Sequence, residues 1–336
     1  MQGQAIVKAS AVDPDLLAEF FRHQGLTTDI RWKYFDEKFG GGHNRGYAAL
    51  SDGKIAGFIG LIPFRAKAGS KSLDSAWTCD WYIDSELAGG ATGIMLLKQA
   101  IAACPSVYHV GGNEITEKVY SRLASHYDAG GIKEYRLALR LGGLLRRAQV
   151  RVPAAAMLSR TVLSRIRIAR LADVPRDSGI EEFDGVAESF SEVLAVQSPE
   201  SSYHPVYDQA YLDWQIGRCP DLTAFTIVHR PGLAALAWYK GKPDSDWRVA
   251  IAYQSDRAGE LPVLLDALAK LAVEKGAESI KVRVSRHSEA LIRALLERGY
   301  DETRRFPFFA FHDRPEDFPA DSMSGLGYLD ADMASI

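Results

Sequence analysis

Residues 83–97 decide the fold, and they read Ile-Asp-Ser-Glu-Leu-Ala-Gly-Gly-Ala-Thr-Gly-Ile-Met-Leu-Leu. The pattern predicts a strand that ends in a glycine-dense turn, from which an apolar helix starts directly. Because Gly89, Gly90 and Gly93 lack a Cβ atom, consecutive backbone N–H groups can converge on an anion at the positive end of the helix dipole. The turn lacks the Lys-Ser/Thr ending of a nucleoside triphosphatase, and its glycine spacing does not fit a dinucleotide fingerprint. It is typical of a loop that holds a pyrophosphate through backbone amides; a plain strand-to-helix turn is the alternative.

Length, charge and hydrophobic content limit the classes of protein to which this chain can belong. A chain of 336 residues with 47% hydrophobic residues can fill the cores of two domains. The net charge of -3 gives no general attraction to nucleic acid or to an anionic membrane. The N-terminus lacks the charged and apolar blocks of a signal peptide, and no apolar run reaches membrane-spanning length. We therefore expect a cytoplasmic protein without a membrane span.

Cysteines and histidines show no metal-ligand pattern. Cys79, Cys104 and Cys219 lie far apart without CxxC or Cys/His spacing, and the eight histidines include no HExxH pair. Asp330 and Asp332 near the C-terminus are two carboxylates without further ligands, so a solvated terminus is favoured. No metal is expected.

The first half of the chain follows a regular order of elements. Asp13 is predicted to cap a helix that begins at Pro14, and Asp52-Gly53 is a strong hairpin signal. The predicted elements, in order, are the helix 13–24, an aromatic element 30–34, the strands 46–50, 55–64 and 76–83, the helix 92–103, the strand 107–110, the helix 115–123 and an alternating stretch around Leu137 and Leu139.

A weaker copy of this order follows residue 176, which predicts a duplication. Leu212-Asp213-Trp214-Gln215-Ile216 parallels Ile30-Arg31-Trp32-Lys33-Tyr34. The further predicted elements are the strands 223–228, 233–239 and 247–253, the helix 261–274, the strand 280–284, the helix 288–298 and the strand 306–311. We expect an N-terminal domain over 1–140, a linker over 141–175, a C-terminal domain over 176–314 and an extended tail over 315–336.

The linker region is basic and apolar at once, because residues 136–171 contain nine arginines and no acidic residue. The simplest interpretation is a crossover whose apolar face packs between the halves while the arginines stay solvated. Binding to RNA, to an anionic substrate or to a lipid surface is the alternative.

The order of elements, with the glycine loop between a strand and a helix, resembles the Gcn5-related N-acetyltransferase family, and the duplication resembles its tandem members. The segments 31–34, 57–63 and 77–82 are also similar to bacterial acetyltransferases of surface-polysaccharide gene clusters. The resemblance implies a mixed α/β fold of two tandem domains, each with a mixed, mostly antiparallel sheet flanked by helices. It also implies acetyl-coenzyme A as cosubstrate.

The family's pyrophosphate loop runs Arg/Gln-x-x-Gly-x-Gly/Ala, and this chain offers Ala88-Gly89-Gly90-Ala91-Thr92-Gly93. The loop departs from the motif at Ala88 and Ala91. An alanine removes no main-chain amide, but losing the leading side chain would cost a hydrogen bond to charge, roughly 1.5–3 kcal/mol. By resemblance, the main chain of Trp81, Tyr82 and Ile83 would pair with the pantetheine arm and polarise the thioester carbonyl.

Catalytic residues are implied by a second motif. Family members carry Asn and, seven residues later, Tyr on the helix after the fifth strand, and Asn113 and Tyr120 match that spacing. Two helical turns would place both side chains toward one cleft, where Tyr120 would protonate the departing thiolate. The strand carboxylate Asp80 is the best-placed base and Glu114 the next, although a solvated or salt-bridged Asp80 is an equal alternative. His109 and His126 are interpreted as surface or satisfied histidines.

The second half offers Ser288 and Leu295 at the positions of Asn113 and Tyr120, so it is expected to be catalytically silent. The sequence thus predicts an acyltransferase that moves an acetyl or other acyl group to an amine or hydroxyl of a small molecule or sugar. Two alternatives stay open: aminoacyl transfer from tRNA, as in peptidoglycan-bridge enzymes, and a non-catalytic acyl-coenzyme A sensor or scaffold. No other nucleic-acid partner is expected, and oligomerisation is left open.

Overall fold

The computed structural model describes residues 5–39, 42–68, 71–87, 91–139, 179–196, 203–229 and 231–313. Three parts of the sequence predictions lie outside these residues: Ala88, Gly89 and Gly90 of the glycine turn, the linker 141–175, and the tail 315–336.

The N-terminal half follows the predicted order. Asp13 caps the first helix, because its Oδ1 accepts from the Asp15 N–H at 2.8 Å. Asp52 and Gly53 both have positive φ, as a two-residue hairpin turn requires. The elements are β1 (Ala5–Lys8), α1 (Pro14–His23), α2 (Ile30–Phe35), β2 (Gly46–Ser51), β3 (Lys54–Ala68), β4 (Lys71–Ile83), α3 (Thr92–Ile101), β5 (Ser106–Val110), α4 (Glu114–Leu123) and β6 (His126–Ala138).

The C-terminal half repeats this order. Its elements are β7 (Ile180–Asp184), α7 (Glu188–Val196), β8 (Tyr203–Val206), α8 (Gln209–Leu212), β9 (Leu222–His229), β10 (Leu233–Lys240), β11 (Asp246–Tyr253), α9 (Leu261–Glu274), β12 (Ser279–Ser285), α10 (Glu289–Glu297) and β13 (Asp301–His312). Here α9 occupies the place of α3, and α10 the place of α4.

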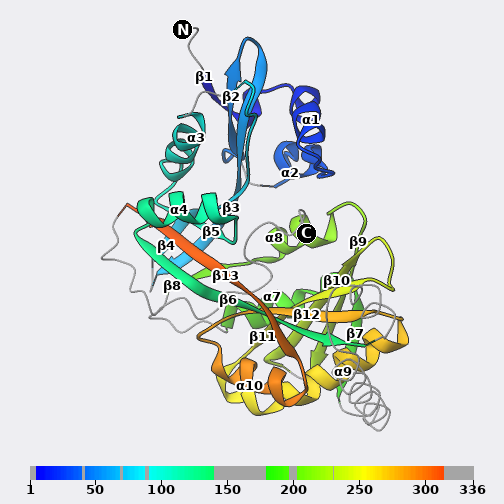
Figure 1. The fold of residues 1–336 in the computed structure, drawn as a ribbon. Helices are drawn as coiled ribbons and strands as arrows, with labels where there is room; N and C mark the ends of the chain where they lie inside the picture. The colour runs from blue at the N-terminus through cyan, green and yellow to red at the C-terminus, as the bar shows by residue number, and fades with distance from the viewer. Residues whose placement is uncertain are drawn as a thin grey trace, which may run out of the picture.

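The two halves share one continuous sheet, because each gives its last strand to the other. The sheet order is β1-β2-β3-β4-β5-β13-β6-β12-β11-β10-β9-β7, with β8 attached to β3. Thus β13 pairs with β5, and β6 pairs with β12, both antiparallel. The pairs β4–β5 and β11–β12 are parallel, so the sheet is mixed and mostly antiparallel. Figure 1 shows β6 and β13 side by side across the middle of the molecule.

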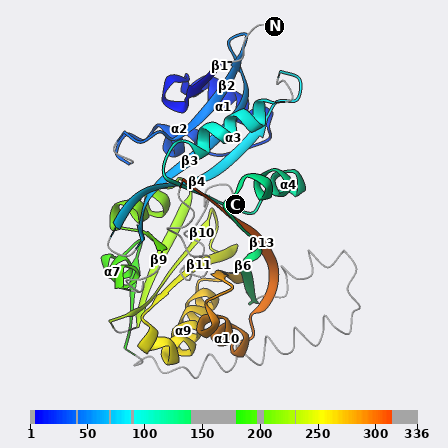
Figure 2. The same ribbon diagram turned by 90° about the vertical axis from the view of Figure 1, so that its left-hand side faces the viewer.

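Helices cover both faces of the sheet. In the N-terminal half, α3 and α4 bury Leu96 and Tyr120 on one face, whereas α1 buries Leu17 and Phe21 on the other (Figures 1 and 2). In the C-terminal half, α9 and α10 pack on one face and α7 on the other. None of the helices in the described ranges is long and apolar enough to cross a membrane.

Trp32 and Trp214, the paired tryptophans of the two aromatic segments, meet at the boundary between the halves. Their rings stack with centroids 5.1 Å apart. Trp32 Nε1 donates to the Trp214 carbonyl at 3.0 Å, and Trp214 Nε1 donates to the Trp32 carbonyl at 3.4 Å. This reciprocal contact is what a two-fold relation between duplicated segments produces.

Candidate active site

An opening between the parallel strands β4 and β5 forms the centre of the candidate site. The strands pair only where Ser75–Trp77 faces Ser106–Tyr108. Beyond Trp77, β4 continues to Ile83 along β3, while β5 continues to Val110 along β13. Among the described strands, none pairs with the β5-facing edge of β4 beyond Trp77, and the backbone along that edge can bind an extended ligand.

Aromatic side chains with polar atoms converge on this opening. Tyr120, fully buried on α4, packs against the Trp81 ring with centroids 5.3 Å apart and against the His109 ring at 4.5 Å. Trp81 Nε1, His109 Nε2 and Tyr120 Oη are all buried and make no well-aligned hydrogen bond within the described residues, although the Thr78 side chain lies close enough to Tyr120 to act on its pKa. Because leaving such groups unpaired costs about 1–3 kcal/mol each, three close together make this opening the candidate ligand site.

Burial sets the protonation of two of these groups. Desolvation raises the pKa of Tyr120 well above its ordinary value, and the neighbouring Thr78 hydroxyl offsets only part of that shift. Desolvation lowers the pKa of His109 to about 4, against the backbone groups of Thr78 and Gly111, which act in the opposite direction. At neutral pH, Tyr120 is therefore a phenol and His109 a neutral imidazole.

Asp80 lies on the opposite face of β4, at a bulge. Between the pairs Gly60–Cys79 and Phe58–Tyr82, β4 has one residue more than β3, and Asp80 adopts a φ of 47°. Its carboxylate binds Lys33 Nζ at 2.6 Å and accepts from the Tyr34 hydroxyl, with both charged side chains almost fully buried. The structure thus shows the salt-bridged alternative, and a base at this position would have to give up these partners.

Gly60 makes room for this buried cluster. A Cβ atom added there would overlap the Tyr34 hydroxyl and lie 2.8 Å from Cys79 Sγ. Glycine is therefore required opposite the bulge.

The start of α3 faces the same opening. Ala91 occupies the N-cap position without a side-chain cap, and the first turn contains no acidic residue. Gly93 lies in that turn, where an added Cβ would come within 3.1 Å of Trp81 Cζ2. The positive end of the α3 dipole therefore carries no acidic side chain and suits an anion such as a phosphate, and Gly93 permits the close approach of α3 to β4.

Asn113 lies outside α4 as its N-cap, where its Oδ1 accepts from the N–H groups of Ile115 at 3.0 Å and Thr116 at 2.9 Å. Its side-chain oxygen is therefore engaged by the first turn of the helix. Glu114 is exposed and faces Lys118 at 4.0 Å. His126 packs on Phe308.

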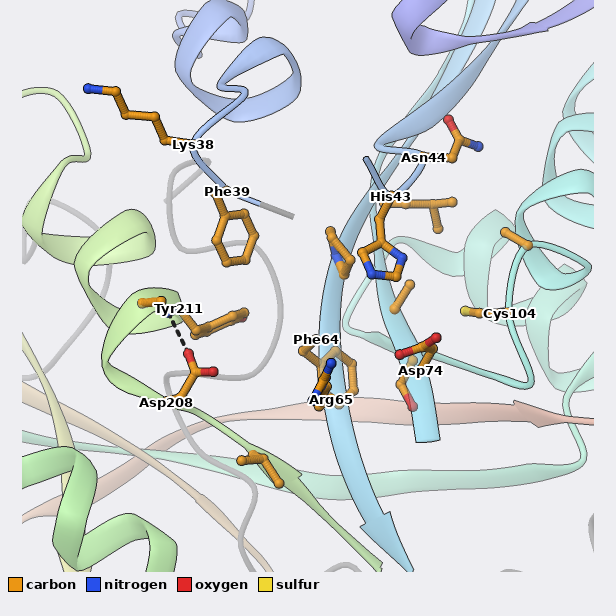
Figure 3. A pocket seen from close by; sticks show the side chains of 17 residues that line it. Lys38, Phe39, His43, Asn44, Phe64, Arg65, Asp74, Cys104, Asp208 and Tyr211 are labelled. Atoms are coloured by element: carbon orange, nitrogen blue, oxygen red, sulfur yellow. Dashed lines mark hydrogen bonds between the residues drawn. The ribbon is translucent and has the colours of Figure 1, made fainter. Parts of the chain in front are cut away.

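A cavity of about 450 Å³ lies where the two halves meet. β2 leaves the edge of β3 near Leu61, whose N–H still binds the Arg45 carbonyl, and β8 joins that edge only at Arg65. Pro63, which has no N–H to leave unpaired, lies in the gap between them. Figure 3 shows Phe39 and Tyr211 on one side of β3, and Asp74 and Cys104 on the other.

The corresponding place in the C-terminal half is apolar and blocked. Leu295, which takes the position of Tyr120, is fully buried among the leucines of α9. Before α9, Glu260 occupies the N-cap position, and Pro262 removes one amide of the first turn. The Glu260 carboxylate binds Arg257 at 2.9 Å and His229 at 3.2 Å. An anion would meet a carboxylate there.

Comparisons with known proteins bear on the fold. No protein family and no curated protein matches the sequence. Among solved structures, a Gcn5-related N-acetyltransferase from Anabaena variabilis is similar over 91% of this chain and 72% of its own, with a TM-score of 0.56 and 13% identity. One from Kribbella flavida has a TM-score of 0.54 and 14% identity over 91% of this chain and 71% of its own.

The N-myristoyltransferase of Saccharomyces cerevisiae, solved with bound myristoyl-CoA, covers 100% of this chain and 83% of its own. Its TM-score is 0.60 at 10% identity. This chain has a tandem Gcn5-related N-acetyltransferase fold. The likeness spans both halves, so the duplication predicted from the sequence is confirmed as the architecture of the tandem acetyltransferase fold.

His109 and Lys33 were missed by the sequence predictions. His109 was interpreted as a surface or satisfied histidine, but its ring packs on Tyr120 and its Nε2 is buried without a partner among the described residues. A histidine one residue before the end of a predicted buried strand, next to the motif of Asn113 and Tyr120, was the available signal. Lys33 gave no signal, because its partner Asp80 is distant in sequence. Within the described residues, no group of histidine, cysteine and acidic side chains is arranged to hold a metal.

Proposed function

We propose that the protein is an acyltransferase that moves an acyl group from acyl-coenzyme A, with acetyl-coenzyme A as the first donor to test, to an amine or hydroxyl of a small molecule or sugar. One observation carries this proposal. The opening between β4 and β5 holds the buried polar atoms of Trp81, His109 and Tyr120, which make no well-aligned hydrogen bond within the described residues, whereas the equivalent Leu295 in the second half has no polar atom to offer.

The geometry supports a defined position for coenzyme A. Its pyrophosphate would meet the N-terminal turn of α3, around Thr92 and Gly93, where the helix dipole is positive and the first turn has no acidic side chain to repel it. The pantetheine arm would extend along the edge of β4 from which β5 has separated, past Trp81, Tyr82 and Ile83. The thioester would then reach the place where Tyr120 packs against Trp81.

Tyr120 is suited to the role of general acid. Because burial raises the pKa of its phenol, Tyr120 stays protonated at neutral pH and can give its proton to the departing thiolate. The apolar rings of Phe309 and Phe311 pack on the other sides of Tyr120, which excludes water from the proton transfer.

Isothermal titration with acetyl-coenzyme A tests the proposal. We expect one molecule bound per chain, and competition by free coenzyme A, because both share the pyrophosphate and pantetheine contacts. Longer acyl forms, starting with myristoyl-coenzyme A, should be titrated in parallel. If none of these ligands binds at millimolar concentration, the chain is not an acyl-coenzyme A-dependent transferase.

A further inference from the structure

His109 is a buried titratable side chain that the proposed function does not use. It lies on β5, opposite Phe309 of β13, at the point where β4 and β5 have separated. The residue is 9% exposed, and its ring packs against Tyr120. A histidine that served only to fill the core would satisfy both ring nitrogens, and this one does not.

The contacts of the other nitrogen bear on the tautomer of the ring. Nδ1 lies 3.2 Å from the backbone carbonyl oxygen of Thr78 and 2.9 Å from its hydroxyl. That hydroxyl can donate to the Tyr108 carbonyl at 3.2 Å. When Nδ1 carries the proton, it can donate to the Thr78 carbonyl while the Thr78 hydroxyl donates to the Tyr108 carbonyl, and the proposal uses this tautomer, in which Nε2 is a lone-pair acceptor. Nε2 is thus both the acceptor atom of the ring and the atom that lacks a hydrogen-bond partner in the opening.

We propose, on the basis of the acyltransferase function above, that His109 and Tyr120 form a proton relay between the attacking nucleophile and the departing thiolate. As the nucleophile's lone pair forms the bond to the carbonyl carbon, His109 Nε2 takes the proton that the nucleophile loses. The carbon–sulfur bond breaks, and the sulfur takes the phenol proton of Tyr120. The imidazolium then returns its proton to the phenolate, which restores both residues. The products are the acylated acceptor and free coenzyme A.

The burial of both rings explains why they would act together. A lone imidazolium and a lone phenolate are each penalised by desolvation, as the directions of their pKa shifts show. When both form in the same step, the pair stays neutral overall and the opposite charges stabilise each other across adjacent rings. Asp80 is unsuited to this role, because it lies in an ion pair on the other face of β4.

Two variants of His109 separate the relay from a structural role. His109→Asn keeps a donor near the Nδ1 position, and with it the Thr78 contact, but removes Nε2. His109→Gln places an amide oxygen or nitrogen near the Nε2 position without a basic nitrogen. We expect both to release coenzyme A from acetyl-coenzyme A, with water as the nucleophile, about 10²–10³-fold more slowly than the natural protein.

Binding of acetyl-coenzyme A is measured on the same variants and should change by less than about threefold in Kd, because Nε2 acts on the proton rather than on the bound ligand. If the natural protein binds no acetyl-coenzyme A, the proposed function has failed. If it binds and either variant retains the natural rate, the relay is overturned while the proposed function stands.

A measurement on the natural protein that needs no turnover tests the relay even if the variants do not fold. The ¹⁵N chemical shifts of His109 in the natural protein report its tautomer directly. We expect a protonated Nδ1 and a bare Nε2 at pH 7. A protonated Nε2 would contradict the relay whatever the rates are.

Discussion

The two halves have the same order of backbone elements, but the side chains at the opening are polar in one half and apolar in the other. Each contains a pair of parallel strands that separate after a short paired segment, followed by a helix that covers the separation. In the N-terminal half, the covering helix brings Tyr120 to Trp81 and His109; in the C-terminal half, it brings Leu295 to the leucines of α9. The fold supplies the opening twice, but the polar side chains on which the proposed site depends are present once.

The difference extends to how each half holds its central strand. In the N-terminal half, β4 has a bulge at Asp80. The Asp80 carboxylate binds Lys33 and Tyr34 on the face of β4 that points away from the opening. In the C-terminal half, β11 pairs with β10 in unbroken register from Leu233–Tyr253 to Trp238–Arg248. A bulge redirects the strand next to the opening, and a regular strand does not. The C-terminal half, which lacks the polar side chains, therefore also lacks a bulge in the strand next to its opening.

The largest effect is expected from removing the Tyr120 hydroxyl. Tyr120→Phe should lower the rate of coenzyme A release from acetyl-coenzyme A by about 10²–10⁴-fold, because the thiolate loses its general acid. The matched control is Tyr300→Phe, since Tyr300 is a buried tyrosine of the C-terminal half whose hydroxyl also lacks a partner. Its rate should be unchanged. Equal losses in the two variants would show that the halves do not differ in this respect.

The buried ion pair should dominate the stability of the N-terminal half. Lys33→Met leaves the Asp80 carboxylate buried without its cation, and we expect the free energy of unfolding to fall by about 3–5 kcal/mol in urea denaturation. Lys281→Met in β12 is the control, because its partner Asp246 keeps Arg136 at 3.1 Å. That variant should lose about 1 kcal/mol or less. A larger loss for Lys281→Met would reverse the comparison.

Stability should also depend on pH through His109. Its pKa is about 4 in the folded protein and 6.5 in the reference state, so the unfolded chain binds the proton more readily. The stabilisation is complete above pH 6.5 and is lost as the pH falls toward 4, by about 2 kcal/mol at pH 5. His312, whose pKa burial also lowers to about 4, contributes in the same range.

The contribution of His109 is isolated by comparing the natural protein with His109→Gln. Urea denaturation at pH 7.5 and pH 5 should show a smaller drop for the variant. Identical drops would mean that His109 titrates normally in the folded protein.

The smallest effect concerns the blocked start of α9. Glu260→Gln removes a half-exposed carboxylate that binds Arg257 and His229, and should cost about 1 kcal/mol or less. It should not create a second coenzyme A site, because Pro262 still lacks an amide and Leu295 still fills the interior. Titration calorimetry showing a second bound molecule would contradict this view of the C-terminal half.

The local elements were predictable from the sequence because their signals are local. Asp13-Pro14 starts α1, Asp52-Gly53 closes the hairpin β2–β3, and the apolar period over 261–274 gives α9 with the predicted bounds. Duplication followed from the repeated order of these elements. The positions of Tyr120 and Trp81 at one opening were predicted from a family resemblance.

What the sequence could not predict are contacts between distant segments. The exchange of β6 and β13 depends on pairing across the whole chain, and no local pattern encodes it. Asp80 was predicted either as a base or as a solvated or salt-bridged carboxylate, and only the fold shows that Lys33, in the last turn of the short helix α2, reaches it. The unpartnered Nε2 of His109 likewise becomes visible only when β4, β5 and α4 are placed together.

The central claim is that the fold has two openings and one site, and a crystal structure with coenzyme A tests it most directly. We predict one coenzyme A molecule per chain, with the pyrophosphate at the first turn of α3, the pantetheine arm along β4 beside Trp81, and the sulfur next to Tyr120. Coenzyme A bound at α9, or in both halves, would contradict the account.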